Sequence, residues 1–430
     1  MIRHRIASKR FLAAAFAGLA AAALALPAAA QDLLIRGATV HTAGAQGTLQ
    51  DADVLVQGGV IRAVGPGLSA PAGIPVVDGK GRQLTPGFFG GLTALGLEEV
   101  SGEPSTVDHR LALGSMAPPD AHPLRPEFDV DVAFDPDSLV VGVNRVEGVA
   151  WTVLSPASVS GGSFIAGQGS AMRLDGRFDG PLANSRSLHV NLGGDALAMS
   201  GGSRAGQWML LEQAIAEARS GVGDDLLTRA GRSTLARYLA GGRVVFHVDR
   251  AADIRQVLVF ARRHGLKAVI SGGAEAWRVA AELKAADVPV LLDALDNLPR
   301  DFDALNATLE NAARLHRAGV RVAFSNGDTH NARRLRQIAG VAVANGLPWG
   351  AALAGLTSVP AQVFGVDDRI GRIAPGQLAD LVLWDGDPLE VTTLPVQVWS
   401  GGVALPMRSR QTLLRDRYAA DEGSLPRAYH

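Results

Sequence analysis

The chain has 430 residues, of which 47% are hydrophobic and 19% are charged, a composition typical of globular proteins and not of disordered ones. Its formal net charge of −1, with basic residues scattered along the chain, gives no electrostatic basis for binding nucleic acid or an anionic membrane. It contains no cysteine, which excludes disulfides and thiol chemistry.

The first 30 residues have the layout of a secretory signal peptide. Basic residues up to Arg10 precede the apolar run 11–26, and residues 28–30 are the small residues of a cleavage site. The run is rich in alanine and shorter than the ~20 residues that a membrane span needs, which favours export over a membrane anchor. We therefore expect residues 1–30 to be removed, and a periplasmic or secreted protein without membrane attachment.

Residues 32–84 contain short runs of alternating apolar and polar residues separated by glycine-rich turns, which predicts a small sheet. Residues 98–137 are rich in proline and acidic residues, and so long a loop typically covers a functional mouth or forms an insertion. The geometry of its carboxylates is open at this point, so chemistry by a carboxylate pair stays possible for Glu98, Glu99, Asp129 and Asp131.

From residue 149 onward, strand-like and helix-like runs follow one another. The helix at 251–264 is expected to bury a stripe formed by Ile254, Val257, Leu258 and Ala261. Such alternation predicts βαβ units and a parallel sheet. The runs read as strands are 149–154, 187–192, 243–248, 266–270, 288–292 and one from Val320, and those read as helices are 203–219, 251–264, 275–286 and 305–318. No GxGxxG, Walker or GxSxG pattern accompanies them.

Residues 320–388 carry the most specific pattern. The strand from Val320 stops at Asn326–Gly327–Asp328, and two helices follow. Within the run RIGRIAPGQLADLVLWDGDP, the glycine-containing turn 371–376 then leads into a short buried strand at 379–384. This segment resembles the closing part of the amidohydrolase superfamily, in particular the imidazolonepropionase-like amidohydrolases. The resemblance extends from residue 33 to about residue 403. It implies a (β/α)₈ TIM-type barrel, residues 85–369, inserted in a discontinuous small β-sandwich domain formed by residues 31–84 and 370–430.

The resemblance also implies a metal site at the mouth of the barrel. Members of the family carry His-x-His after the first strand, Lys or Glu at mid-barrel, one His after each of strands five and six, and Asp after strand eight. In this chain Leu92 and Ala94 occupy the two first-strand histidine positions, and Gly272 the sixth-strand one. None of these three side chains can ligate a metal.

Three candidate ligands are left by this comparison with the family pattern. His247 and Asp328 are retained, and His189 stands where relatives offer a lysine. Two imidazoles and one carboxylate suit a single zinc ion with water as the fourth ligand. As alternatives, a single histidine at a strand end is more often structural than a metal ligand, and Asp328 is placed to cap the helix that follows it.

Two interpretations of function remain open at this stage. In the first, the protein is a hydrolase of non-peptide C–N bonds in amides or cyclic amides, with Asp328 as the general base for an attacking water and one zinc or no metal. In the second, it is an exported, non-catalytic barrel protein that binds a small molecule or a partner, because Leu92 and Ala94 replace the metal ligands. Ser155–Pro156 and residues 161–168 resemble a loop at the rim of the family's active site, although a glycine- and serine-rich surface loop has the same pattern.

Export has a direct test. If the signal peptide is cleaved after Ala30, N-terminal sequencing of the exported protein reads Gln-Asp-Leu-Leu. The corresponding control replaces Arg3, Arg5, Lys9 and Arg10 by Asn, which removes the positive charge that precedes the apolar run and should lower export. A soluble cytoplasmic protein that retains Met1 would contradict the prediction.

Overall fold

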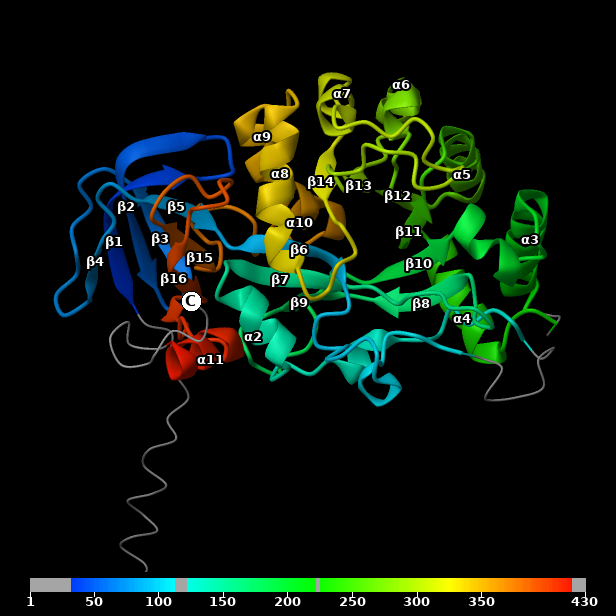
Figure 1. The fold of residues 1–430 in the computed structure, drawn as a ribbon, viewed down its shortest axis with the longest axis horizontal. Coiled ribbons are helices and arrows are strands. Elements are labelled where there is room, and N and C mark those ends of the chain that lie inside the picture. The colour runs from blue at the N-terminus through cyan, green and yellow to red at the C-terminus, as the bar shows by residue number, and fades with distance from the viewer. Residues whose placement is uncertain (1–31, 113–121, 222–224, 420–430) are drawn as a thin grey trace, which may run out of the picture.

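The computed structural model describes residues 32–112, 122–221 and 225–419, so the predicted signal peptide at residues 1–30 lies outside the described residues. In these ranges no helix combines the length and the apolar character needed to cross a membrane. The fold is mixed α/β, with one sheet at one end of the molecule and two further sheets flanked by helices at the other (Figure 1).

The first sheet is built from both ends of the chain. Its strand order is β17-β16-β15-β5-β1-β2-β3, with β4 paired to β1. The N-terminal half contains β1 (Leu33–His41), β2 (Thr48–Gln57), β3 (Val60–Gly65), β4 (Val76–Asp78) and β5 (Gln83–Pro86). The C-terminal half contains β15 (Leu381–Trp384), β16 (Pro395–Ser400) and β17 (Val403–Ala404). Because β15 pairs antiparallel with β5, the N-terminal strands and the C-terminal strands share one hydrogen-bonded sheet.

The other two sheets contain the predicted parallel strands. One has the order β6-β7-β9 and the other β14-β13-β12-β11-β10-β8. Their strands are β6 (Phe88–Thr93), β7 (Val149–Leu154), β8 (Ile165–Gly169), β9 (Ala171–Arg173), β10 (Ser187–Asn191), β11 (Arg243–Val248), β12 (Lys267–Gly272), β13 (Val290–Leu292) and β14 (Val322–Phe324). Neighbours are parallel within β6–β7 and from β10 to β14, whereas β8 and β9 run antiparallel to their partners.

These two sheets approach each other at both edges. At one edge a single residue, Ser170, separates β8 from β9, and its carbonyl accepts a hydrogen bond from Leu154 N at 2.9 Å. At the other edge Leu92 N donates to Ser325 Oγ at 2.9 Å, and Ala94 N donates to Thr329 Oγ1 at 3.0 Å. The first and the last parallel strands are thus joined by side-chain hydrogen bonds.

Helices follow most of the parallel strands. They are α2 (Leu139–Arg145), α3 (Arg204–Ser220), α4 (Arg229–Leu239), α5 (Ala251–His264), α6 (Ala280–Ala285), α7 (Asn311–Arg317), α8 (Leu335–Ala344), α9 (Trp349–Leu356), α10 (Ser358–Phe364) and α11 (Arg410–Tyr418). Short 3₁₀ turns lie at Pro104–Thr106, Val130–Ala133, Gly194–Met199, Ala276–Val279 and Ala332–Arg334. The predicted stripe of α5 is confirmed as buried, and Gly265, at φ 70°, ends this helix in the left-handed conformation that glycine adopts without strain.

Two contacts anchor the composite sheet to the rest of the molecule. Arg173 on β9 donates to Asp380 Oδ1 at 2.7 Å, beside the start of β15. Trp384, fully buried on β15, stacks on Phe88 of β6 with ring centroids 5.2 Å apart and donates to Thr85 Oγ1 at 2.9 Å. The sheet and the parallel strands therefore share a packed boundary, while a division of the chain at residues 84 and 370 into separate domains stays a prediction.

The Trp384 contact predicts a large effect on stability. Trp384→Ala removes a fully buried aromatic side chain and leaves a cavity, so we expect the free energy of unfolding to fall by about 3–5 kcal/mol in urea denaturation. Phe302→Ala is the control, because Phe302 is 86% exposed and its loss should change stability by less than about 0.5 kcal/mol. Equal effects of the two substitutions would show that packing at this boundary contributes little to the free energy of unfolding.

Candidate functional site

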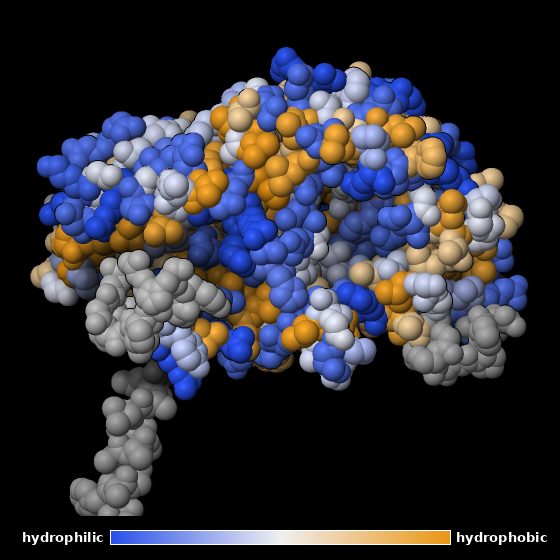
Figure 2. Space-filling model, in the orientation of Figure 1, coloured by the Kyte–Doolittle hydropathy of each residue, from blue (hydrophilic) through white to orange (hydrophobic). Residues whose placement is uncertain are grey.

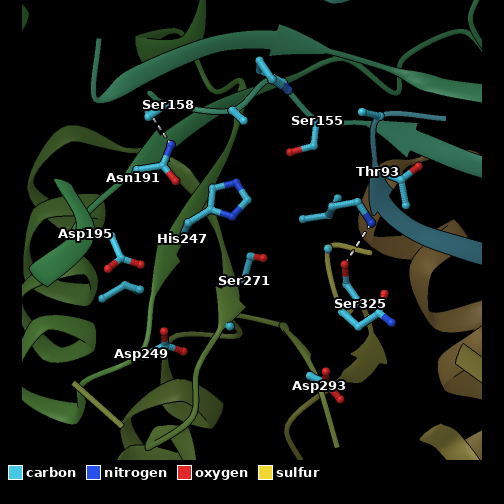
Figure 3. Close-up of a pocket in the computed structure, with 18 of the residues that line it drawn as sticks. Thr93, Ser155, Ser158, Asn191, Asp195, His247, Asp249, Ser271, Asp293 and Ser325 are labelled. Atoms are coloured by element: carbon cyan, nitrogen blue, oxygen red, sulfur yellow. Dashed lines mark hydrogen bonds between the residues drawn. The ribbon is translucent and has the colours of Figure 1, made fainter. Parts of the chain in front are cut away.

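A polar cavity of about 630 Å³ lies at the carboxyl ends of the parallel strands. This is the end at which α/β barrels place their chemistry. Seven strands each supply one polar lining side chain, from one of their last two residues or from the residue directly after them: Thr93, Ser155, Asn191, His247, Ser271, Asp293 and Ser325. Figure 2 shows hydrophilic residues gathered around the hollow at the middle of this face, and Figure 3 shows these seven side chains, His247 among them.

The structure brings His189 and His247 together, as two neighbouring parallel strands allow. His189 on β10 and His247 on β11 approach with Nδ1 and Nε2 3.1 Å apart. Burial lowers the pKa of His247 to about 4, and burial together with the neighbouring His247 lowers the pKa of His189 well below its usual value. Both imidazoles are therefore neutral at neutral pH.

His189 is fully buried and has two further hydroxyl neighbours. Ser155 Oγ lies 3.2 Å from its Nδ1, and Ser187 Oγ lies 3.2 Å from its Nε2. Ser187 in turn donates its hydroxyl hydrogen to the carbonyl of Gly169 at 3.3 Å. Of these residues, Ser155 lines the cavity, as does His247.

Asp328 is placed differently from the two histidines. Its Oδ1 accepts a hydrogen bond from Asn331 N at 3.2 Å, and its Oδ2 accepts one from Asn331 Nδ2 at 2.9 Å. The cavity is lined by its neighbours Asn326, Gly327 and Thr329, and Asp328 is not among the lining residues. The carboxylate thus holds the turn that precedes Ala332–Arg334, which agrees with the alternative that it caps the following helix.

The positions around His247 do not fit a metal centre of the kind that the family pattern implies. Leu92 and Ala94 are buried among apolar side chains, and Gly272 has a φ of +89°. A Cβ at position 272 would lie 2.6 Å from Asp249 Oδ1, so a histidine there would displace Asp249. Throughout residues 32–112, 122–221 and 225–419, no group of three or more His, Cys, Asp or Glu side chains is arranged to hold a metal ion. Zinc bound by His189, His247 and Asp328 stays a prediction that this geometry does not support.

Part of the cavity lining, called here the acidic side, carries several carboxylates. Asp195, Asp249, Asp293 and Asp296 line it together with a single guanidinium, that of Arg300. Arg300 donates to Asp296 Oδ2 at 2.8 Å and also to Asp249. Burial raises the pKa of Asp249, with Arg300 opposing the rise, and burial also raises the pKa of Asp293. Four carboxylates facing one guanidinium make this side attractive to ligands with N–H groups or positive charge.

Three of the four loop carboxylates singled out in the sequence form ion pairs with basic side chains, and the fourth, Glu99, accepts a backbone hydrogen bond. Asp129 and Asp131 both bind Arg186, and Asp131 also accepts the hydroxyl hydrogen of Ser170 at 2.6 Å. Glu98 lies 3.2 Å from Arg110 Nη2, and Glu99 accepts a hydrogen bond from Leu139 N at 3.0 Å. Because none of the four lines the cavity, the geometry gives no support to chemistry by a pair of these carboxylates.

Sequence reasoning missed the acidic side and the contact between Ser155 and His189, although it placed Ser155–Pro156 in a loop at the rim of the site. Asp249, Asp293 and Ser155 each come directly after a strand, at Val248, Leu292 and Leu154. The rule that site residues follow the carboxyl ends of parallel strands was therefore a usable signal for all three. The contact between Ser155 and His189 joins residues 34 positions apart, and no sequence pattern signals it.

Comparisons with known proteins give a consistent result. The model of the Amidohydrolase family matches residues 231–409. The chain is 30% identical over 358 residues to the adenine deaminase of Deinococcus radiodurans, covering 82% of this chain and 58% of that one. It is 33% identical over 166 residues to the imidazolonepropionase of Maricaulis maris, covering 37% of this chain and 40% of that one.

A solved structure shows the same fold. The amidohydrolase from Thermotoga maritima superposes with a TM-score of 0.77 at 24% identity, covering 87% of this chain and 100% of that one. The chain spans between 12% and 58% of the length of the curated relatives that it matches. The closing sequence pattern, the family model and these likenesses together show that the chain belongs to the amidohydrolase superfamily.

Proposed function

We propose that this protein binds a small polar molecule in the cavity and does so without a metal centre. The observation that carries the proposal is the lining itself. Seven strands direct polar side chains into one cavity, whereas Leu92, Ala94 and Gly272 occupy positions that relatives use for metal ligands. Two imidazoles are one protein ligand fewer than the minimum for a catalytic zinc.

We also propose that the β6-β7-β9 sheet and the six-stranded sheet form one (β/α)₈-type barrel, inserted in a small β-sandwich domain made by both chain ends. The hydrogen bonds at both edges support this arrangement, namely Leu154 to Ser170 and Leu92 to Ser325. With β8 and β9 counted as one interrupted strand, the ring has eight strands. The interrupted strand runs antiparallel to its neighbours, whereas the other strands of the ring pair in parallel with one another.

The acidic side of the cavity defines the ligand class. A small amide, cyclic amide or amidine presents N–H groups to Asp249 and Asp293 and a carbonyl or ring nitrogen to the hydroxyls of Thr93, Ser155 and Ser271. Two relatives are named for nitrogen-rich ring compounds, adenine deaminase and imidazolonepropionase, which supports the same class. Export to the periplasm or medium, with no nucleic-acid or membrane partner, belongs to this proposal.

A second candidate is a metal-dependent hydrolase of non-peptide C–N bonds. Membership of the amidohydrolase superfamily favours it. In this case Asp328 accepts the proton of the attacking water, which requires its carboxylate to leave Asn331 and turn into the cavity. The two candidates predict different effects of zinc on the thermal stability of the protein.

Thermal unfolding of the chelator-treated protein with a panel of lactams, amides and amidines tests the first candidate. A bound ligand at 100 times its Kd stabilises the folded state by about 2.7 kcal/mol, which raises Tm measurably. We expect N–H-rich members to raise Tm and zinc to leave it unchanged. Asp293→Asn removes one carboxylate from the acidic side and should weaken the binding of amidines by about tenfold.

Asp287→Asn is the matched control for Asp293→Asn. Asp287 has a side chain that is 81% exposed and lies outside the cavity lining, and asparagine tolerates its φ of 53°. The Asp287→Asn variant should bind the compounds of the panel as the unsubstituted protein does. A rise in Tm with zinc that His247→Ala abolishes, together with ammonia or amine release from a panel member, would instead support the metal-dependent hydrolase.

A further inference from the structure

The neighbours of His189 suit one of its two neutral tautomers, in which the hydrogen is on Nε2. Ser187 has one hydroxyl hydrogen, and it donates this hydrogen to the carbonyl of Gly169 at 3.3 Å. Toward His189, Ser187 Oγ can therefore only accept, and the partner at 3.2 Å is Nε2. We therefore assign the hydrogen of His189 to Nε2, which leaves Nδ1 unprotonated.

The unprotonated Nδ1 faces the end of β7. A neutral imidazole nitrogen without hydrogen accepts, so the Ser155 hydroxyl at 3.2 Å donates to it. His247 Nε2, at 3.1 Å from the same nitrogen, shares this acceptor as a second donor. The backbone of Ser155 is held in place by its N–H, which donates to the carbonyl of Thr93 at 2.9 Å.

The Ser155 hydroxyl and the His189 imidazole differ in their access to solvent. Ser155 lines the cavity, in the position shown in Figure 3, whereas His189 is fully buried behind it. A ligand in the cavity can therefore reach the serine oxygen, and His189 contacts the cavity through the Ser155 side chain. A hydroxyl next to a base that a third group orients is the arrangement that activates serine nucleophiles.

We propose that Ser155 is a nucleophile for acyl transfer, with His189 as its general base and Ser187 as the residue that positions His189. This activity needs no metal and uses the cavity already described. It rests on the proposed function in one respect, since the acyl compound is a member of the same class of small amides and cyclic amides, or an ester of similar size.

The step balances within these groups. The Ser155 O–H proton passes to His189 Nδ1 while Oγ forms a bond to the carbonyl carbon, and the C=O π pair moves to the carbonyl oxygen. When this pair returns, the C–N bond breaks, and the leaving nitrogen takes the proton from His189 Nδ1. A water molecule, whose proton His189 accepts, then attacks the acyl-serine, releases the acid and restores the Ser155 hydroxyl.

A fluorophosphonate probe tests the nucleophile without knowledge of the substrate. Serine nucleophiles displace fluoride from such probes, so the labelled peptide gains the phosphonyl group and fluoride leaves. We expect the chelator-treated protein to be labelled at Ser155, as mapped by peptide mass spectrometry, and Ser155→Ala to lose the label. Ser105→Ala is the control, because Ser105 is exposed and donates its hydroxyl hydrogen to Glu103 Oε1 at 2.7 Å, outside the cavity; its labelling should be unchanged.

Ser187→Ala separates positioning from a structural role. It removes the acceptor for the His189 Nε2–H, so we expect the labelling rate at Ser155 to fall about tenfold or more. Ser187→Thr keeps a hydroxyl and should restore the rate, and circular dichroism confirms folding of each variant. Labelling at serines other than Ser155, or none at probe concentrations that fully label a serine hydrolase, would overturn the proposal. Ligand binding in the thermal unfolding experiment is independent of the label, so failure of the nucleophile and failure of the binding function are distinguishable.

Discussion

Two hydrogen bonds between the first and the last parallel strands hold one edge of this cavity together. Leu92 N donates to Ser325 Oγ and Ala94 N donates to Thr329 Oγ1, which ties β6 to the residues after β14 across more than 230 positions of sequence. The same two residues belong to the hydrophobic clusters and line this edge of the cavity with apolar side chains. The edge that brings the strands together is therefore also the edge at which the family's metal ligands are missing.

The chemistry that remains depends on polar side chains at the other strand ends. His247 and the hidden His189 are neutral because they are buried, and the acidic side is balanced by Arg300 alone. A cavity of this kind is complementary to molecules with N–H groups. Members of one superfamily share a fold while the residues of the site set the function, and this chain has kept the position of the site and changed its donors.

The sequence predicted the elements with strong periodicity and the segment with the specific pattern. The stripe of α5 and the strand from Val320 lie where expected, and β15 follows the glycine-rich turn as predicted. The predicted helix at 305–318 begins only at Asn311, because the preceding residues form a loop in which Asn306 accepts a hydrogen bond from Trp277 Nε1 at 2.9 Å. The predicted helix at 275–286 is divided into a 3₁₀ turn and α6. In both cases tertiary contacts override local helix preference.

The site was less predictable than the fold, for a physical reason. Gly327, with a φ of +67°, turns the chain after β14 so that Asp328 meets Asn331, and a sequence pattern does not contain the direction of such a turn. The contacts of His189 with Ser155 and His247 depend on the register of β10 and its neighbours. The most direct test of a cavity without a metal is anomalous diffraction at the zinc absorption edge from crystals grown with zinc. The account predicts no anomalous peak beside His247, and an ordered peak about 2.0–2.1 Å from nitrogens of both His189 and His247 would contradict it.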